Sequence, residues 1–458
     1  MPILEKLTAR EVFDSRGHPT VEVEAVASGG ARGRAIAATG GSVGKHEARE
    51  LRDGEPRRHG GRGVRLAVGL IASEVGPALI GMDLDDQQAI DSALIALDGT
   101  PDKSRLGSNA TLAASLAAAR AAADARGEEV HVHLNRLWRR KLAPEEAGGP
   151  SLPMPMAHMI SGAARVGRTL DFQDVLMIPV GARDFSEAMA MTAAVYRALG
   201  EVLHKHGHPS HLTCHNGGYG PKLWSNAQAV DHLLEAVLVA GLEIARDVAV
   251  ALDVAAAHFH DPDTAIYTLA VGRESHDAAG MIAMLEHWTR QYPIVSIEDG
   301  LGQDDWDGWI ALTERLGATV QLAGDDLFAT RPDRIGPGLG RKAANAVLIK
   351  PGQVGTLSET FDALALARRL GCRAIIAARS GETEDTTVAD LAVATAAGQV
   401  KFGGVARSER LAKYNRLLRI EGDLGTTARY QGRAAMLATN GNGTGIDSNG
   451  RKVNGSAP

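Results

Sequence analysis

The stretch Pro-Ile-Val-Ser-Ile-Glu-Asp-Gly at residues 293–300 decides the fold, because a short apolar run ends there in a carboxylate. Similar short runs, apolar or rich in β-branched residues, recur along the chain at 175–180, 248–254, 320–323, 347–349 and 374–377. Most of them are separated by helical patterns, such as residues 358–370, where Phe361, Leu364, Leu366 and Leu370 mark one apolar face. Strands that alternate with helices in this way predict a parallel sheet.

Six or more such strand–helix units that close on themselves make a (β/α) barrel, so we expect an α/β fold with a barrel over residues 157–438. Residues 1–140 are different in character and predict a compact α+β domain. In this part, Val21, Val23 and Ala25 alternate with glutamates, as in a half-buried strand, and residues 109–123 form an Ala/Leu-rich run with helical spacing.

Two further segments connect or extend these domains. Residues 142–156 contain four prolines and two glycines, so we interpret 141–156 as a linker between the domains. The last stretch, 439–458, is rich in Gly, Asn and Ser and has almost nothing to bury, which predicts a disordered tail.

Composition excludes several classes of protein. The 458 residues include 49 Lys and Arg against 55 Asp and Glu, a net charge of −6 without a basic block, which argues against a nucleic-acid partner. Only Cys214 and Cys372 are present, so a disulfide framework is excluded and a reducing compartment is favoured. No secretory signal and no long apolar run is visible, and we therefore expect a cytoplasmic enzyme without a membrane segment.

Three carboxylates follow predicted strands, where the working residues of a barrel are located. They are Asp253, Glu298 and Asp325. Because these strand ends converge, the three side chains predict an oxygen-lined site for Mg²⁺, which binds a few carboxylates and keeps positions for water and substrate. A single acid at a strand end could simply cap the next helix, but three in series favour the metal.

Basic residues follow the next strands. Lys350, the pair Arg379-Ser380, and Lys401 occupy these positions. A poorly solvated lysine that faces Mg²⁺ and a second lysine is expected to have a lowered pKa and to act as a base. The alternative is a lysine that extends from the barrel rim into solvent. We expect proton abstraction next to a carboxylate, with Arg379 and Ser380 holding a phosphate or similar anion.

Several longer motifs carry a specific resemblance. The chain resembles the enolase family in EVFDSRGHPTVEVEA, LGSNATLAASLAAARAAA, YPIVSIEDGLGQDDW, ARSGETEDTTVADL and RSERLAKYNRLLRIE. The resemblance implies an N-terminal α+β capping domain, a barrel that begins with an irregular ββαα order, and a homodimer or larger homo-oligomer. It also implies one or two Mg²⁺ ions, with Asp253, Glu298 and Asp325 as ligands of the tighter one.

The resemblance assigns roles to further residues. Lys350 matches the base that takes the C2 proton of 2-phosphoglycerate, and Lys401, Arg379 and Ser380 match residues that hold its carboxylate or phosphate. Ser42 matches the serine of a mobile loop that closes over the second Mg²⁺, and Gln173 is a further candidate for substrate binding.

The sequence departs from the family at four places. Asn216 stands where enolases have the glutamate that protonates the leaving hydroxide, and Asp174 replaces a longer glutamate. Arg165 replaces a loop histidine, and Ala377-Ala378 precede Arg379 where a serine and a histidine are expected. An amide cannot supply a proton at neutral pH, so these changes predict slow dehydration of 2-phosphoglycerate.

These departures lead to three hypotheses of function. The first is a carboxyphosphonoenolpyruvate synthase-like step in phosphonate (phosphinothricin-type) biosynthesis, with Arg165 helping to receive a nucleotide-activated phosphonate. The second is a phosphopyruvate hydratase of glycolysis in which Asp174 or a bound water replaces the missing glutamate. The third is a non-catalytic enolase-like binding protein.

Overall fold

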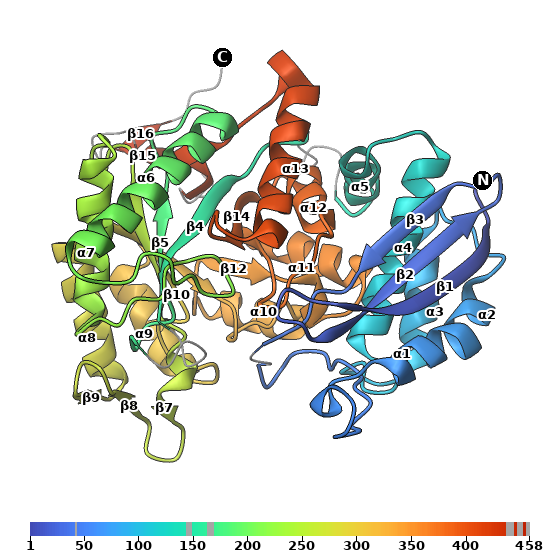
Figure 1. The fold of residues 1–458 in the computed structure, drawn as a ribbon, viewed down its shortest axis with the longest axis horizontal. Coiled ribbons are helices and arrows are strands. Elements are labelled where there is room, and N and C mark those ends of the chain that lie inside the picture. The colour runs from blue at the N-terminus through green and yellow to red at the C-terminus, as the bar shows by residue number, and fades with distance from the viewer. Residues whose placement is uncertain (42–43, 143–148, 163–168, 437–443, 447–451, 455–458) are drawn as a thin grey trace.

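The structure is a computed structural model, which describes residues 1–41, 44–142, 149–162, 169–436, 444–446 and 452–454. Its elements form an N-terminal capping domain and a barrel, seen side by side in Figure 1. The capping domain contains β1 (Leu4–Phe13), β2 (Pro19–Ala27), β3 (Arg32–Ile36), α1 (Arg65–Leu70), α2 (Gly76–Leu79), α3 (Gln87–Asp98), α4 (Ser108–Ala125) and α5 (Val130–Arg139).

The barrel domain begins with two consecutive strands and two consecutive helices. They are β4 (Met154–Ser161), β5 (Asp174–Ile178), α6 (Phe185–Lys205) and α7 (Asn226–Val239). The later elements are β6 (Ala249–Asp253), α8 (Ala278–Gln291), β10 (Ile294–Glu298), α9 (Trp306–Leu316), β11 (Gln321–Gly324), α10 (Pro332–Gly340), β12 (Ala346–Ile349), α11 (Leu357–Arg369), β13 (Arg373–Ala377), α12 (Thr387–Thr395), β14 (Gly398–Gly403) and α13 (Ser408–Leu424).

In the described part of the chain, β10-β11-β12-β13-β14-β4-β5-β6 close into one barrel. Its neighbouring strands are parallel except around β5, which runs antiparallel to both β4 and β6. The expected fold class, a barrel with an irregular ββαα start and an α+β capping domain, is therefore confirmed.

The sequence analysis did not predict a small antiparallel sheet between β6 and α8. It contains β7 (His260–Asp261), β8 (Ile266–Leu269) and β9 (Glu274–His276). Strand β4 begins at Met154, inside the 141–156 segment that was interpreted as a linker. In the stretch expected to be disordered, Thr444–Ile446 (β15) and Lys452–Asn454 (β16) pair antiparallel, and its other residues lie outside the described ones.

Two packed layers hold the barrel together. Inside it, apolar side chains such as Met156, Leu176 and Leu348 form one buried cluster. Between the strands and the surrounding helices, a larger cluster includes Trp309, Phe361 and many aliphatic side chains. None of the helices in the described ranges combines the length and the apolar character that a membrane crossing requires.

The capping domain depends on a close approach between β3 and α4, whose Ala-rich sequence leaves room for the sheet. A Cβ atom placed on Gly33 would lie 2.1 Å from the backbone oxygen of Ala117 and 2.2 Å from the backbone nitrogen of Ala121. Because backbone atoms of a buried helix cannot rotate away, only glycine fits at this position of the strand.

We predict that Gly33→Ala lowers the free energy of unfolding by about 1–3 kcal/mol, because the added methyl group overpacks the sheet against α4. The measurement is urea unfolding followed by intrinsic fluorescence. Gly69→Ala is the matched control: Gly69 is exposed on α1, nothing lies within 4 Å of its added Cβ, and a small stabilisation is expected. Equal unfolding midpoints for the two variants would contradict this account of the packing.

Candidate active site

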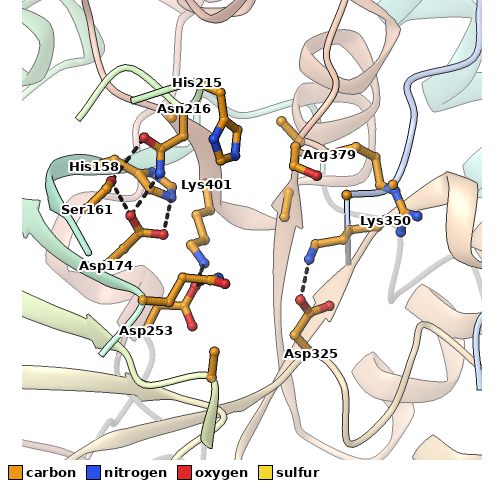
Figure 2. A pocket seen from close by; sticks show the side chains of 18 of the residues that line it. His158, Ser161, Asp174, His215, Asn216, Asp253, Asp325, Lys350, Arg379 and Lys401 are labelled. Carbon is orange, nitrogen blue, oxygen red and sulfur yellow. Dashed lines mark hydrogen bonds and ion pairs between the residues drawn. The ribbon is translucent and has the colours of Figure 1, made fainter. Parts of the chain in front are cut away.

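A cavity lies where the barrel strands end, facing the capping domain. Glu47 and the glycines Gly40 and Gly41 line it from the capping domain. Residues from the barrel that line it include His158, Ser161, Gln173, Asp174, His215, Asn216, Asp253, Asp325, Lys350, Arg379, Ser380 and Lys401. Figure 2 shows Asp253, Lys401 and Asn216 on one side of this cavity and Lys350 and Arg379 on the other. The cavity therefore brings together most of the predicted site residues.

The three predicted carboxylates lie at adjacent strand ends. Asp253 ends β6 and Glu298 ends β10, and the two residues are direct partners in the parallel strand register. Asp325 follows β11, the next strand of the barrel. All three side chains are buried, and Asp253 is only 1% exposed. The three carboxylates thus lie at neighbouring strand ends, and their role as metal ligands stays a prediction.

Two lysines neutralise part of this negative charge. The Nζ atom of Lys401 lies 2.6 Å from Oδ2 of Asp253 and 2.8 Å from Oε1 of Glu298. The Nζ atom of Lys350 donates to Oδ2 of Asp325, which also accepts a hydrogen bond on Oδ1 from Gln353 at 3.0 Å. The lysines are therefore paired with the carboxylates and do not extend into solvent.

The charges around Lys350 correct one expectation. Burial lowers the pKa of Lys350, but the carboxylates of Asp325 and Glu298 raise it by more, so the pKa of Lys350 lies above its ordinary value. The sequence analysis expected a lowered pKa because it weighed burial and a neighbouring cation. It did not weigh the direct contact with Asp325.

Asp299 is a buried acid that the sequence analysis did not single out. Its carboxylate oxygens accept hydrogen bonds from the backbone N–H groups of Asp325, at 3.0 Å, and Asp326, at 2.9 Å. The backbone of Asp299 has a φ of 45°, which turns the chain sharply after β10. Asp299 therefore positions Asp325, a predicted metal ligand. The repeated acids at 298–299 and 325–326 were the signal in the sequence that could have identified it.

The carboxylates fit a divalent cation with a preference for oxygen ligands. Burial and the nearby Asp253 raise the pKa of Glu298 to about 8, and burial and Asp325 raise the pKa of Asp326 to about 7. Carboxylate oxygens of Glu298, Asp299 and Asp325 lie within 4.8 Å of one another. This crowded negative charge is unfavourable in a buried site, and Mg²⁺ would offset it.

The opposite wall of the cavity carries the groups expected to bind anions. Arg379 is buried, and its Nη1 lies 2.5 Å from Oε2 of Glu47 in the capping domain. Arg410, on α13, donates hydrogen bonds of 2.8 Å to the backbone oxygens of both Arg379 and Ser380. The sequence analysis missed Glu47 and Arg410, because residues so distant in the chain become neighbours only through the tertiary structure.

Gln173 contacts a predicted metal ligand. Its Nε2 donates to Oδ2 of Asp253 at 2.8 Å, the same oxygen that Lys401 contacts. Its role as a substrate ligand stays a prediction. Two further site residues of the sequence analysis, Ser42 and Arg165, lie outside the described residues.

Asp174 and Asn216, two of the departures from the family pattern, belong to one hydrogen-bonded network. Asp174 accepts hydrogen bonds from Nδ2 of Asn216, at 2.8 Å, and from the hydroxyl of Ser161. Its other oxygen lies 3.4 Å from Nε2 of His158. Burial raises the pKa of Asp174, but the nearby His158 and the hydrogen bonds lower it by more, so its pKa lies below the ordinary value. Asp174 is thus a poor proton donor.

Asn216 belongs to a tight turn, and the residue before it, His215, faces the cavity. The backbone nitrogen of Cys214 donates to the oxygen of Gly218 at 2.7 Å, and the side-chain oxygen of Asn216 accepts from the nitrogen of Gly218 at 3.1 Å. The amide of Asn216 points to Asp174 and Ser161, whereas the ring of His215 projects into the cavity (Figure 2). Asn216 therefore anchors the turn that presents His215.

A barrel with buried carboxylates, paired lysines and an arginine at one end defines a metal-dependent enzyme for a small anionic substrate. The family model for the enolase N-terminal domain matches residues 4–134, and that for the enolase C-terminal TIM barrel domain matches residues 150–439. The chain is also 48% identical over 439 residues to the enolase of Mycobacteroides abscessus, which covers 95% of this chain and 98% of that protein. The chain belongs to the enolase family.

Family membership decides several expectations. The resemblance to enolases, the assignment to the lyases of this superfamily and the choice of magnesium are confirmed. The phosphonate-biosynthesis hypothesis is wrong, because the similarity to an enolase extends over nearly the whole chain. A few changed residues had been given more weight than the many that match, and a nucleotide-activated phosphonate is not supported as a partner.

We predict that Mg²⁺ at 100 times its Kd raises the free energy of unfolding by about 2.7 kcal/mol, because it binds the folded chain. Asp325→Asn removes one charged ligand, so the same Mg²⁺ concentration should add less than about 1 kcal/mol. Urea unfolding with and without Mg²⁺ measures both values. Asp263→Asn, at an exposed position between β7 and β8, serves as the control. If Mg²⁺ stabilised Asp325→Asn as much as it stabilises the unmodified chain, Asp325 would not be a ligand of the ion.

Proposed function

We propose that this protein is a phosphopyruvate hydratase, which removes water from 2-phosphoglycerate to form phosphoenolpyruvate. The observation that carries the proposal is the buried group of Asp253, Asp325, Lys350 and Lys401 around one cavity, with Glu298 in contact with Lys401. It is supported by the identity of 48% to a protein named enolase over 95% of the chain. This hypothesis replaces the phosphonate pathway as the best account of the site.

The substrate is expected to lie between the two walls of the cavity. Arg379 and Ser380 would hold its phosphate, since a guanidinium offers a fork of N–H donors to such an anion. Lys401 would face the carboxylate side, and its two acidic neighbours keep its ammonium charged because they raise its pKa well above the ordinary value. These roles rest on the position of each side chain in the lining of the cavity.

Asp253, Glu298 and Asp325 are proposed as the ligands of the magnesium ion. When bound there, Mg²⁺ supplies positive charge that stabilises the negative charge developing on the substrate carboxylate. Lys350 would then take the proton from C2, because its Nζ lies at Asp325 and faces the cavity (Figure 2). The negative charge of Asp325 and Glu298 raises the pKa of Lys350, and a bound Mg²⁺ would offset that charge, which favours the neutral amine that a base requires. A second ion and the role of Ser42 stay predictions.

The second step is loss of the hydroxyl group from C3, which needs a proton. Asn216 cannot provide one, and Asp174 is held as a carboxylate by its hydrogen-bond donors. We infer that His215 donates this proton, because its imidazole reaches the cavity from the turn that Asn216 anchors. Imidazole is suited to acid catalysis near neutral pH. A bound water remains the alternative donor.

The same proposal leads to expectations for the substrate, the oligomeric state and the cellular location of the protein. We infer a small phosphorylated substrate and self-association of the chain into a homodimer or a larger assembly. A cytoplasmic location stays the expectation that composition favours. A non-catalytic binding protein is the remaining alternative, and the assays below distinguish it, because it would show neither exchange nor dehydration.

We predict that Lys350→Ala abolishes both chemical steps, since no base remains to remove the C2 proton. Formation of phosphoenolpyruvate from 2-phosphoglycerate is followed by absorbance, and exchange of the C2 hydrogen with deuterium by NMR. Lys222→Ala, at an exposed position outside the cavity lining, is expected to keep both activities. Retained C2 exchange in Lys350→Ala would show that this lysine is not the base.

We predict that His215→Gln reduces formation of phosphoenolpyruvate by about 10²–10⁴-fold, the usual contribution of general acid catalysis. Exchange of the C2 hydrogen with deuterium should persist, because Lys350 and the carboxylates are unchanged. The control His211→Gln alters an exposed histidine of the same loop. Equal losses of exchange and dehydration, or no loss, would contradict a role of His215 in the second step alone.

A further inference from the structure

A group of histidines lies at the end of α6, outside the cavity. His206 follows the last residue of α6, and His232 and Glu235 lie one turn apart on α7, which packs against α6 (Figure 1). The ring centroids of His206 and His232 are 4.6 Å apart, and the ring of His208 lies 5.6 Å from that of His232. Three imidazoles and one carboxylate therefore meet at this helix pair.

His232 shows that this group is more than a surface feature. The residue is only 5% exposed, and its Nε2 atom is buried without a hydrogen-bond partner among the described residues. An unpaired buried polar atom costs about 1–3 kcal/mol, so a ligand for it would be favourable. Burial and the neighbouring His206 and His208 lower the pKa of His232, which keeps the imidazole neutral, the form that binds metals.

We propose that His206, His232 and Glu235 form a binding site for a divalent transition metal of the Zn²⁺ type. One ligand atom from each residue lies within 4.8 Å of the others. The ligand atoms of a tetrahedral zinc ion are about 3.4 Å apart, for bonds of about 2.1 Å, so small side-chain rotations bring the three to bonding distance. Imidazole nitrogen together with carboxylate favours Zn²⁺, Co²⁺, Ni²⁺ or Cu²⁺ over Mg²⁺.

The cations already next to Glu235 do not block the site. Lys205 lies 2.8 Å from Oε1 of Glu235, but its side chain is largely exposed and can turn into solvent. His206 Nε2 lies 2.8 Å from Oε2 of the same carboxylate, and a metal would replace this contact with two bonds. His208 is close enough to His232 to supply a fourth ligand.

The position of the site indicates what a bound metal would do. His206 and His208 begin the segment that connects α6 to α7, and this segment carries the turn of Cys214, His215 and Asn216. Tyr219, farther along the segment, pairs with Ile160 of β4. A metal held by His206, His232 and Glu235 would fix the start of the segment to α7, while Tyr219 fixes its later part to the barrel.

The test uses the full chain, stripped with a chelator and then kept in excess MgCl₂ so that the acidic cavity is occupied. Calorimetric titration with ZnCl₂ is expected to show one equivalent that is lost, or bound at least tenfold more weakly, in Glu235→Gln and in His232→Gln. His287→Gln, an exposed histidine on α8, should bind as the unmodified chain does. Zinc that enters the acidic cavity would remain in all three variants.

The absorption spectrum of bound Co²⁺ gives a second measurement. A tetrahedral site with imidazole ligands should produce visible bands that disappear in Glu235→Gln, whose partly exposed position makes a folded variant expected. The proposal is overturned if Glu235→Gln binds Zn²⁺ with the stoichiometry and affinity of the unmodified chain. It is also overturned if the unmodified chain binds none. The result does not depend on the hydratase activity.

Discussion

The site depends on one electrostatic constraint: acidic side chains from adjacent strand ends are buried together and must be neutralised. Lys401 contacts both Asp253 and Glu298, and Lys350 contacts Asp325. Each lysine therefore offsets the negative charge of acids that the barrel brings close together. A divalent cation would complete this balance. Because the charges are buried, losing one partner leaves another uncompensated, which makes the whole group act as a unit.

The part of the cavity around Asn216 shows how the same fold can accept different side chains. Asn216 cannot donate a proton and has a structural role instead. Its amide donates a hydrogen bond to Asp174 and accepts one from Ser161, and these bonds hold the turn in place. That turn places an imidazole, His215, in the cavity. In the proposed mechanism, removal of the C2 proton and loss of the hydroxyl group are thus assigned to separate groups, Lys350 and His215.

Sequence reasoning succeeded where position along a strand decides position in space. Asp253, Glu298 and Asp325 could be predicted as neighbours because parallel strands of a barrel end at one edge. It failed for the pKa of Lys350, which depends on a contact between side chains, and for Asp299, whose role depends on a sharp turn of the backbone. It also gave too much weight to Asn216, because the hydrogen bonds of this amide are not visible in the chain.

The sequence by itself determined the alternation of strands and helices in the barrel, the residue types at the strand ends and the family, since these follow from local periodicity and long matching motifs. Only the tertiary structure decided which distant groups meet. Glu47 and Arg379 are separated by 332 positions, and Gln173 and Asp253 by 80, yet each pair is in contact. Closure of the barrel and docking of the capping domain create these contacts, because burial of apolar surface brings together segments that no local pattern relates.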